Sequence, residues 1–181
     1  MSGFRSGFVS IVGCPNAGKS TLLNRLVGQK IAIVSDRAQT TRNRVTGVLT
    51  RDGYQIVFLD TPGMTTPRNR LGEYMQKVAV DALSDAEAVL FVADAQQGVR
   101  DRDERILERL SLVKAPLFAL VNKCDAAPMA AVDQANASLS ARKIFQQVLI
   151  GSARTGEGLD ALEGALLAQM REGPRYFPDD M

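Results

Sequence analysis

An eight-residue stretch near the N-terminus constrains the fold of this chain more than any other part of its sequence. Residues 13–20 read Gly-Cys-Pro-Asn-Ala-Gly-Lys-Ser and match the pattern G-x-x-x-x-G-K-S. Gly13 and Gly18 let the backbone curl so that its N–H groups point inward at phosphate oxygens. Lys19 reaches the β- and γ-phosphates of a nucleotide, and the hydroxyl of Ser20 can bind Mg²⁺. The stretch therefore predicts a phosphate-binding P-loop.

The segments on both sides of this loop fit the same interpretation. The apolar run Phe8–Val12 is typical of a buried strand, and Thr21–Val27 follows with helical spacing and ends at Gly28. The N-terminus of that helix would face the phosphates. The alternative is a glycine turn between a strand and a helix that ends in Lys-Ser by chance. The flanking elements favour the phosphate-binding loop.

A second motif, Asp60-Thr61-Pro62-Gly63, fits the pattern D-x-x-G and follows an apolar run. Behind a P-loop, Asp60 is expected to hold Mg²⁺ through water, and the backbone amide of Gly63 to sense the γ-phosphate. The alternative is a Pro-Gly turn that closes a strand.

A third motif, Asn122-Lys123-Cys124-Asp125, indicates which base is bound. The carboxylate of Asp125 can accept hydrogen bonds from N1–H and the 2-amino group of guanine, whereas adenine offers neither donor in that arrangement. We expect Asn122 to brace the neighbouring loops and the stem of Lys123 to lie over the base plane. Ser152-Ala153, further along the chain, would add a backbone N–H directed at the guanine O6. A polar loop after a strand is the simpler alternative.

The order of the elements predicts an α/β fold. Apolar strands alternate with amphipathic helices, which indicates a mostly parallel, six-stranded sheet with helices on both faces. One strand is expected to be antiparallel, because residues 45–50 and 54–59 flank an Asp52-Gly53 turn signal. A helix should begin near Leu71. Another helix should have Asp101 as its N-cap residue and Glu104 as the second residue of a capping box. Each motif falls after the carboxyl end of a strand, where ligands bind in such folds.

Composition excludes several classes of function. The 181 residues suggest one domain, and the net charge of +2 gives no overall case for binding nucleic acid or membrane. Sixteen of the 22 basic residues are arginine, and some of them cluster at 37–51 and 68–70; either a solvated face or a surface for phosphate or RNA would explain this. The chain has no histidine, which excludes a Ser-His-Asp mechanism.

Nothing in the sequence indicates export or insertion into a membrane. No signal peptide is visible, and no apolar run approaches the length needed to span a bilayer. The two cysteines, Cys14 and Cys124, are too few for a disulfide framework, and we expect both to be free thiols in a reducing compartment.

Taken in order, the motifs resemble those of the Ras-like, translation-factor class of GTPases. A more specific resemblance, to the bacterial Era family, lies in residues 29–35 (QKIAIVS), 38–44 (AQTTRNR) and 60–64 (DTPGM). The tail 176–180 (YFPDD) is similar to the segment that precedes the second domain of that family. The resemblance covers essentially the whole chain.

This resemblance implies a guanine-nucleotide switch that hydrolyses GTP to GDP and phosphate with Mg²⁺ as cofactor. The loops 29–44 and 61–70 would be ordered by the γ-phosphate and released after hydrolysis. The implied metal ligands are Ser20, Asp60 and Thr41, with Thr40 as the alternative to Thr41. The implied catalytic residues are Lys19, Asn16, Thr41 and Gly63. The implied nucleotide-binding residues are Gly13, Asn16, Ala17, Gly18, Lys19, Ser20, Thr21, Asn122, Lys123, Asp125, Ser152, Ala153 and Arg154.

Hydrolysis is expected to be slow. Met64 occupies the position after D-x-x-G at which many GTPases place a glutamine that orients the attacking water. The pattern Pro15-Asn16-x-Gly18-Lys19 resembles GTPases in which the asparagine helps to hold K⁺ against the phosphates, so K⁺ is a candidate second cofactor. The alternative is that Asn16 only tolerates a turn conformation.

The resemblance also implies domain boundaries, binding partners and a location. Residues 1–172 would form the GTPase domain, and residues 173–181 a linker toward a C-terminal KH-type RNA-binding domain that lies outside this sequence. Either the chain is an excised domain or the protein is naturally short. In the family, the KH domain binds small-subunit ribosomal RNA and the pre-ribosome. We expect a monomer in the cytoplasm, or peripherally at the inner membrane.

Two other functions fit parts of the sequence. A P-loop ATPase or small-molecule kinase would use the same phosphate loop, but Asn122–Asp125 argues against it. A non-catalytic interaction module could use the fold as a scaffold, but intact Lys19, Ser20 and Asp60 argue against that.

Overall fold

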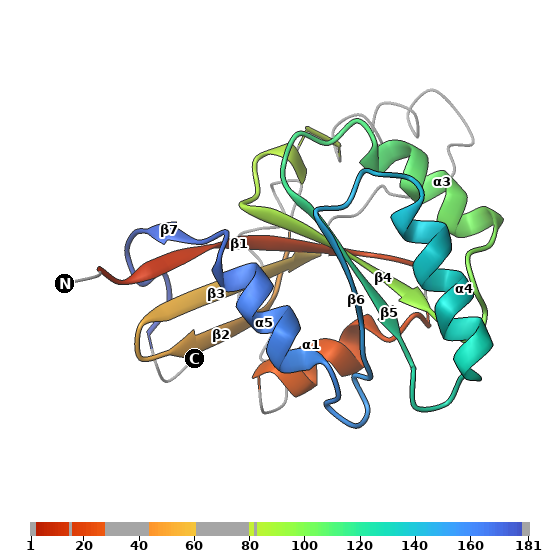
Figure 1. Ribbon diagram of the computed structural model, residues 1–181. Coiled ribbons are helices and arrows are strands. Elements are labelled where there is room, and N and C mark those ends of the chain that lie inside the picture. The colour runs from red at the N-terminus through yellow and green to blue at the C-terminus, as the bar shows by residue number, and fades with distance from the viewer. Residues whose placement is uncertain (1–2, 15, 28–43, 61–79, 82, 179–181) are drawn as a thin grey trace.

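The computed structural model describes residues 3–14, 16–27, 44–60, 80–81 and 83–178. Strands and helices alternate along most of the chain (Figure 1). The strands are β1 (Arg5–Val12), β2 (Arg44–Arg51), β3 (Tyr54–Asp60), β4 (Ala88–Asp94), β5 (Leu117–Asn122), β6 (Gln147–Ile150) and β7 (Arg171–Glu172). The helices with defined bounds are α1 (Lys19–Val27), α3 (Asp101–Leu110), α4 (Met129–Ser140) and α5 (Leu159–Leu167).

The strands form one sheet in the order β2-β3-β1-β4-β5-β6. β1 runs parallel to β3 and β4, β4 to β5, and β5 to β6, whereas β2 is antiparallel to β3. The hairpin register pairs Arg51 with Tyr54, so the turn falls at Asp52-Gly53 as its sequence indicates. The predicted α/β fold, with a mostly parallel sheet and an antiparallel strand, is confirmed.

The structure adds a seventh strand that the sequence pattern did not reveal. β4 pairs with Val9–Val12 of β1 and leaves the N-terminal part of that edge open. There β7 pairs antiparallel with Arg5 and Ser6. A strand of two residues is too short to show any periodicity, so its existence depends on the open edge beside it.

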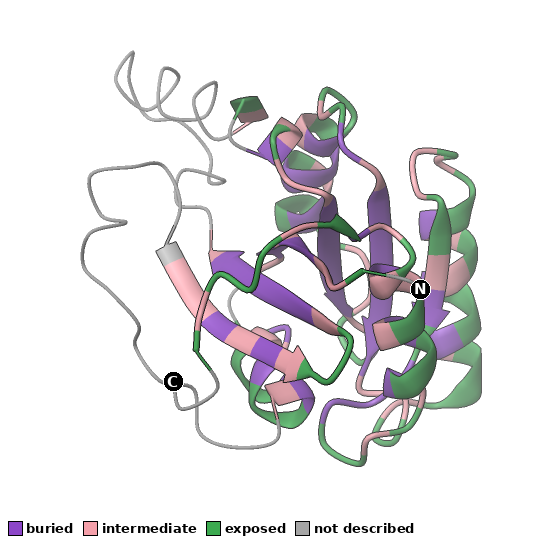
Figure 2. Ribbon diagram, turned by 90° about the vertical axis from the view of Figure 1, so that its left-hand side faces the viewer, coloured by how far each residue is buried: buried purple, intermediate pink, exposed green. Residues whose placement is uncertain are grey.

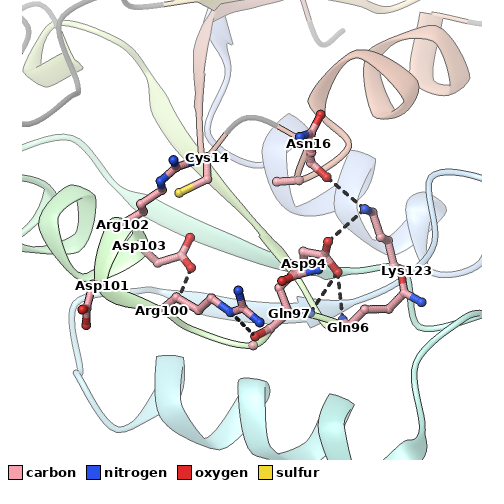
Figure 3. Close-up of a pocket in the computed structure, with 12 residues that line it drawn as sticks. Cys14, Asn16, Asp94, Gln96, Gln97, Arg100, Asp101, Arg102, Asp103 and Lys123 are labelled. Atoms are coloured by element: carbon pink, nitrogen blue, oxygen red, sulfur yellow. Dashed lines mark hydrogen bonds and ion pairs between the residues drawn. The ribbon is translucent and has the colours of Figure 1, made fainter.

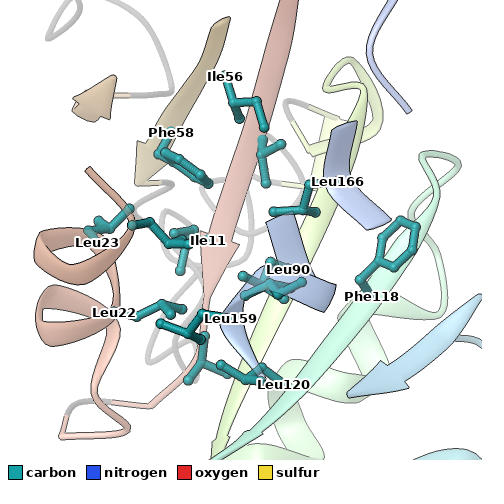
Figure 4. Close-up of a cluster of buried hydrophobic side chains, with 14 of the residues drawn as sticks. Ile11, Leu22, Leu23, Ile56, Phe58, Leu90, Phe118, Leu120, Leu159 and Leu166 are labelled. Atoms are coloured by element: carbon teal, nitrogen blue, oxygen red, sulfur yellow. The ribbon is translucent and has the colours of Figure 1, made fainter. Parts of the chain in front are cut away.

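The sheet separates two apolar clusters, and Figure 4 shows the one that lies against α1 and α5. On one face Leu90 and Val92 of β4 contribute to the cluster that holds the apolar sides of α1 and α5. Their neighbours Val89 and Phe91 contribute to the cluster with α3 and α4 on the other face. Because successive strand residues point to opposite faces, a strand covered on both sides must be apolar throughout. The central strands are accordingly buried along most of their length (Figure 2).

The start of α3 differs from the expected arrangement. The helix begins at Asp101, and Arg100 rather than Asp101 is its N-cap residue. The carboxylate that completes the cap is that of Asp103, whose Oδ2 accepts a hydrogen bond from the Arg100 backbone N–H at 2.9 Å. Glu104 instead pairs with Arg142, so the expected roles of Asp101 and Glu104 were wrong by one residue each. Of the three acidic residues in the first turn of α3, Asp103 is the buried one.

Some expected features lie outside the described residues. These are most of the helix expected from Leu71 and the loop residues Thr40, Thr41, Gly63 and Met64. Among the described residues, no helix is long and apolar enough to cross a membrane.

The segment after β7 packs against the sheet, although it has no regular structure. Gln55 of β3 is fully buried, and its Oε1 accepts hydrogen bonds from the backbone N–H groups of Tyr176 and Phe177 at 2.9 and 3.1 Å. Its Nε2 donates to the Phe177 carbonyl and to the Thr50 hydroxyl, both at 2.9 Å. All four hydrogen-bonding positions of this amide are therefore used. The ring of Tyr176 also lies 4.9 Å from that of Phe8.

We predict that Gln55→Leu releases this segment. The substitution removes the buried acceptor and donor that hold residues 176 and 177, and should lower the free energy of unfolding by roughly 2 kcal/mol. Trypsin should then cut after Arg175 faster than in the unmodified protein, as followed by mass spectrometry. Gln134→Leu, at an exposed position of α4, is the matched control. Equal cleavage rates in the two variants would show that Gln55 does not hold the segment.

Candidate nucleotide-binding site

The loop between β1 and α1 has the backbone that its sequence requires. Gly18 has φ +101°, and a Cβ there would collide with the side-chain amide of Asn122. Gly13 passes so close to β4 that a Cβ would lie 2.6 Å from the carbonyl oxygen of Val92. Glycine at these two positions therefore lets the loop approach the ends of β4 and β5.

Lys19 lies across this loop. Its Nζ donates a hydrogen bond to the Gly13 carbonyl at 2.7 Å, which brings the ammonium over the turn. Ala17 is buried within the loop, whereas Ser20 and Thr21 are exposed at the start of α1. The N–H groups of this first turn and the ammonium of Lys19 make a concentrated positive end, which suits an anion such as phosphate.

Asn122 joins the P-loop to the loop after β6. This residue is only 2% exposed. Its Nδ2 donates to the Ala17 carbonyl, and its Oδ1 accepts from the Ala153 backbone N–H, both at 2.9 Å. The structure thus brings together the P-loop, the base motif Asn122–Asp125 and Ser152-Ala153, as expected if Asn122 braces these loops.

The carboxylate of Asp125 is oriented by a buried serine. The hydroxyl of Ser152 donates to Oδ1 of Asp125 at 2.8 Å and accepts from the Thr155 backbone N–H at 3.1 Å. Asp125 itself is exposed, as is Arg154. One carboxylate oxygen is therefore fixed while the side chain stays open to solvent, where a ligand can reach it.

Lys123 forms the other side of this region (Figure 3). Its Nζ donates to the Asn16 carbonyl and to Oδ2 of Asp94, each at 2.9 Å. Both Asn16 and Lys123 have left-handed backbones, with φ of 71° and 70°. That conformation is one asparagine tolerates well, so it agrees with the turn interpretation of Asn16. Among the described residues, the Asn16 side chain has no hydrogen-bond partner.

Asp94 is a residue that the sequence reasoning missed. It is the last residue of β4 and lies beside Asn122 in the sheet register. Its position at the carboxyl end of an apolar strand could have identified it, because Asp60 has the same position on β3.

The predicted metal-binding residues fall on neighbouring elements. Ser20 lies in the first turn of α1, and Asp60 ends β3, where it pairs with Ile11 in the register with β1. Thr41 and Thr40 are outside the described residues. Within the part of the chain that is described, no cluster of three or more cysteine or acidic side chains could hold a metal ion.

The P-loop and Lys123 border an open cavity of about 840 Å³ that extends to the start of α3. Cys14 lines it and is a half-buried free thiol, as is Cys124 in the base motif, so the prediction of free thiols is confirmed. Burial and the nearby carboxylate of Asp103 raise the pKa of the Cys14 thiol to about 11.

We predict slow alkylation of Cys14 near neutral pH. Because only the thiolate reacts, the iodoacetamide rate in a Cys124→Ala variant should rise about tenfold per pH unit and level off near pH 11. Asp103→Asn should speed the reaction at pH 8, since it removes a negative charge that disfavours the thiolate. A rate that levels off below pH 9 would contradict the assigned environment.

Comparisons with known proteins agree with this geometry. A family described as "50S ribosome-binding GTPase" matches residues 8–123. GTPase Era of Alkaliphilus metalliredigens is 43% identical over 178 residues, which are 98% of this chain and 60% of that protein. The chain thus spans about three-fifths of the length of this relative.

Two solved structures resemble the fold over 98% of this chain and 61% of their own chains. One is Era in complex with MgGDPNP and nucleotides 1506–1542 of 16S ribosomal RNA, with 38% identity and a TM-score of 0.78. The other is a variant of Aquifex aeolicus Era bound to GDP.AlF4-, with 39% identity and a TM-score of 0.75. The resemblance to the Era GTPases is therefore confirmed, and this chain belongs to the family of 50S ribosome-binding GTPases.

Proposed function

We propose that this chain binds guanine nucleotides with Mg²⁺ and hydrolyses GTP to GDP and phosphate. The observation that carries the proposal is the pair of hydrogen bonds made by Asn122. It links the P-loop at Ala17 to the Ser152–Ala153 loop at a fixed distance. A phosphate site and a base site held rigidly together suit one nucleotide that spans both.

Selectivity for guanine would come from Asp125. Ser152 already holds one of its oxygens, so that oxygen is positioned before a ligand arrives. Guanine offers two donors to such a carboxylate, whereas adenine would leave it desolvated and unpaired. This arrangement disfavours the ATPase or kinase alternative.

The oxygen atoms near the P-loop suit Mg²⁺. Ser20 and Asp60 offer a hydroxyl and a carboxylate, which are oxygen ligands of the kind that this ion prefers. They lie at the ends of neighbouring elements of the same sheet edge. We propose Ser20, Asp60 and Thr41 as the residues that hold the metal. When bound, Mg²⁺ neutralises negative charge on the phosphates.

The remaining residues would act by placing charge. Lys19, already over the P-loop, would pair with the β- and γ-phosphates and stabilise negative charge as the bond breaks. The amide of Gly63 is proposed to contact the γ-phosphate. Since Met64 cannot orient water, we propose a slow intrinsic rate.

Era relatives support a role beside ribosomal RNA. The neighbouring Era structure contains part of 16S ribosomal RNA, and its chain is longer than this one. The family description names the 50S subunit instead. We give more weight to the Era structure, because its similarity covers nearly the whole chain, and propose small-subunit RNA as the partner. We also propose residues 1–172 as the GTPase domain and 173–181 as a connecting segment, since the last strand ends at Glu172.

Phosphate release from GTP and ATP tests the activity and the base choice together. We expect Mg²⁺-dependent release from GTP only. Asp125→Asn should weaken GTP binding by at least tenfold and favour xanthosine triphosphate, because an amide can donate to the 2-oxo group. Unchanged GTP affinity in that variant would remove Asp125 from its role. Release from ATP at the same rate would support the ATPase alternative.

We also propose that K⁺ assists hydrolysis through Asn16, an exposed residue of the P-loop. A cation there would offset charge that develops between the β- and γ-phosphates. Hydrolysis should run faster in KCl than in NaCl at equal ionic strength, and Asn16→Ala should abolish the difference. Equal rates in the two salts for the unmodified protein would leave Asn16 with only its turn role.

A further inference from the structure

The carboxylate of Asp94 lies beside the base motif, although no motif includes it (Figure 3). Asp94 ends β4 and its side chain is 11% exposed. The next residue, Ala95, donates its backbone N–H to the Asn122 carbonyl at 2.9 Å. The residue is thus fixed to the strand that leads into the base motif.

The two oxygens of Asp94 have separate partners. Oδ1 accepts hydrogen bonds from the backbone N–H groups of Gln96 and Gln97 at 2.8 and 3.4 Å. This holds the turn after β4 and sets the orientation of the carboxylate. Oδ2 is then directed at Nζ of Lys123, 2.9 Å away. The acceptor for the ammonium is therefore held in place by the backbone.

The ammonium of Lys123 is held at two points on two different elements. One point is Oδ2 of Asp94 on β4 and the other is the carbonyl of Asn16 in the P-loop. The backbone of Lys123 is itself fixed in a left-handed conformation. A lysine stem has four rotatable bonds, and fixing both of its ends leaves it little freedom.

The carboxylate of the Asp94–Lys123 ion pair is better shielded than those of two other ion pairs, Arg51–Glu163 and Arg142–Glu104. Its carboxylate is 11% exposed, compared with 16% for Glu163, which pairs with Arg51, and 44% for Glu104, which pairs with Arg142. Shielded pairs are less screened by salt than exposed ones. Salt should therefore weaken the Asp94–Lys123 contact less than it weakens the other two pairs.

We propose that Asp94 is a positioning residue of the nucleotide site, which holds the Lys123 ammonium against the P-loop so that the lysine stem forms a fixed wall for the face of the base. This inference rests on the proposed guanine-nucleotide binding. A stem that contacts the face of a purine does not read its edge. Asp94 should therefore slow nucleotide release without affecting the choice of base, which is left to Asp125.

Asp94→Asn isolates this role. The amide oxygen can still accept from Gln96 and Gln97, but the amide nitrogen that replaces Oδ2 cannot accept from an ammonium. We expect the GDP dissociation rate and Kd to rise about tenfold, as for the loss of a hydrogen bond to a charged group. Inosine diphosphate, which lacks the 2-amino group, should be weakened by the same factor. Glu104→Gln, which breaks an ion pair away from the cavity lining, should leave both affinities unchanged.

A double-mutant cycle distinguishes positioning from a general structural effect. In a Lys123→Met background, which keeps an apolar stem without the ammonium, Asp94→Asn should have no further effect on GDP release. A second tenfold loss there, a dissociation rate within twofold of the unmodified protein for Asp94→Asn alone, or a changed ratio of GDP to inosine diphosphate affinity would each overturn the inference. Failure of the unmodified protein to bind GDP would instead overturn the proposed function.

Discussion

The candidate site depends on the two hydrogen bonds made by the buried side-chain amide of Asn122. Both of its polar atoms are used, and the backbone groups that they satisfy belong to the P-loop and to the loop after β6. Removing the side chain would leave a buried carbonyl and a buried N–H unpaired, at about 1–3 kcal/mol each. The same amide explains Gly18, because any side chain there would occupy its place. The P-loop and the loop after β6 are therefore held together as one unit.

The parallel sheet makes this unit possible. β1, β3, β4 and β5 run in the same direction, so the residues that follow their carboxyl ends gather at one edge. Lys19, Asp60, Asp94 and Asn122 are far apart in sequence but follow or end neighbouring strands. The two apolar clusters on either side of the sheet keep those strand ends in register. The chemistry of the site is thus set by short polar segments on a rigid apolar frame.

The opposite edge of the sheet carries a second set of polar contacts. Gln55 binds the backbone of residues 176 and 177, and Glu163 of α5 accepts hydrogen bonds from Arg51 and Tyr54. Burial alone would raise the pKa of Glu163, but the hydrogen bonds from Arg51 and Tyr54 lower it below its ordinary value. The β2–β3 hairpin is therefore tied at its turn to α5 and to the C-terminal segment, while the far end of β3 leads to Asp60.

The sequence by itself determined strands β1 to β6 of the sheet, the P-loop and the base motif. Each of these is a local pattern: a period of two or an apolar run, a glycine spacing, or a polar motif after a strand. The tertiary structure alone decided which distant residues meet. Asp94 holds Lys123, the carboxylate of Asp103 lies near Cys14 of the P-loop, and β7 fills the open edge of β1. The physical reason is that a hydrogen bond depends on distances between folded elements, and spacing along the chain does not contain those distances.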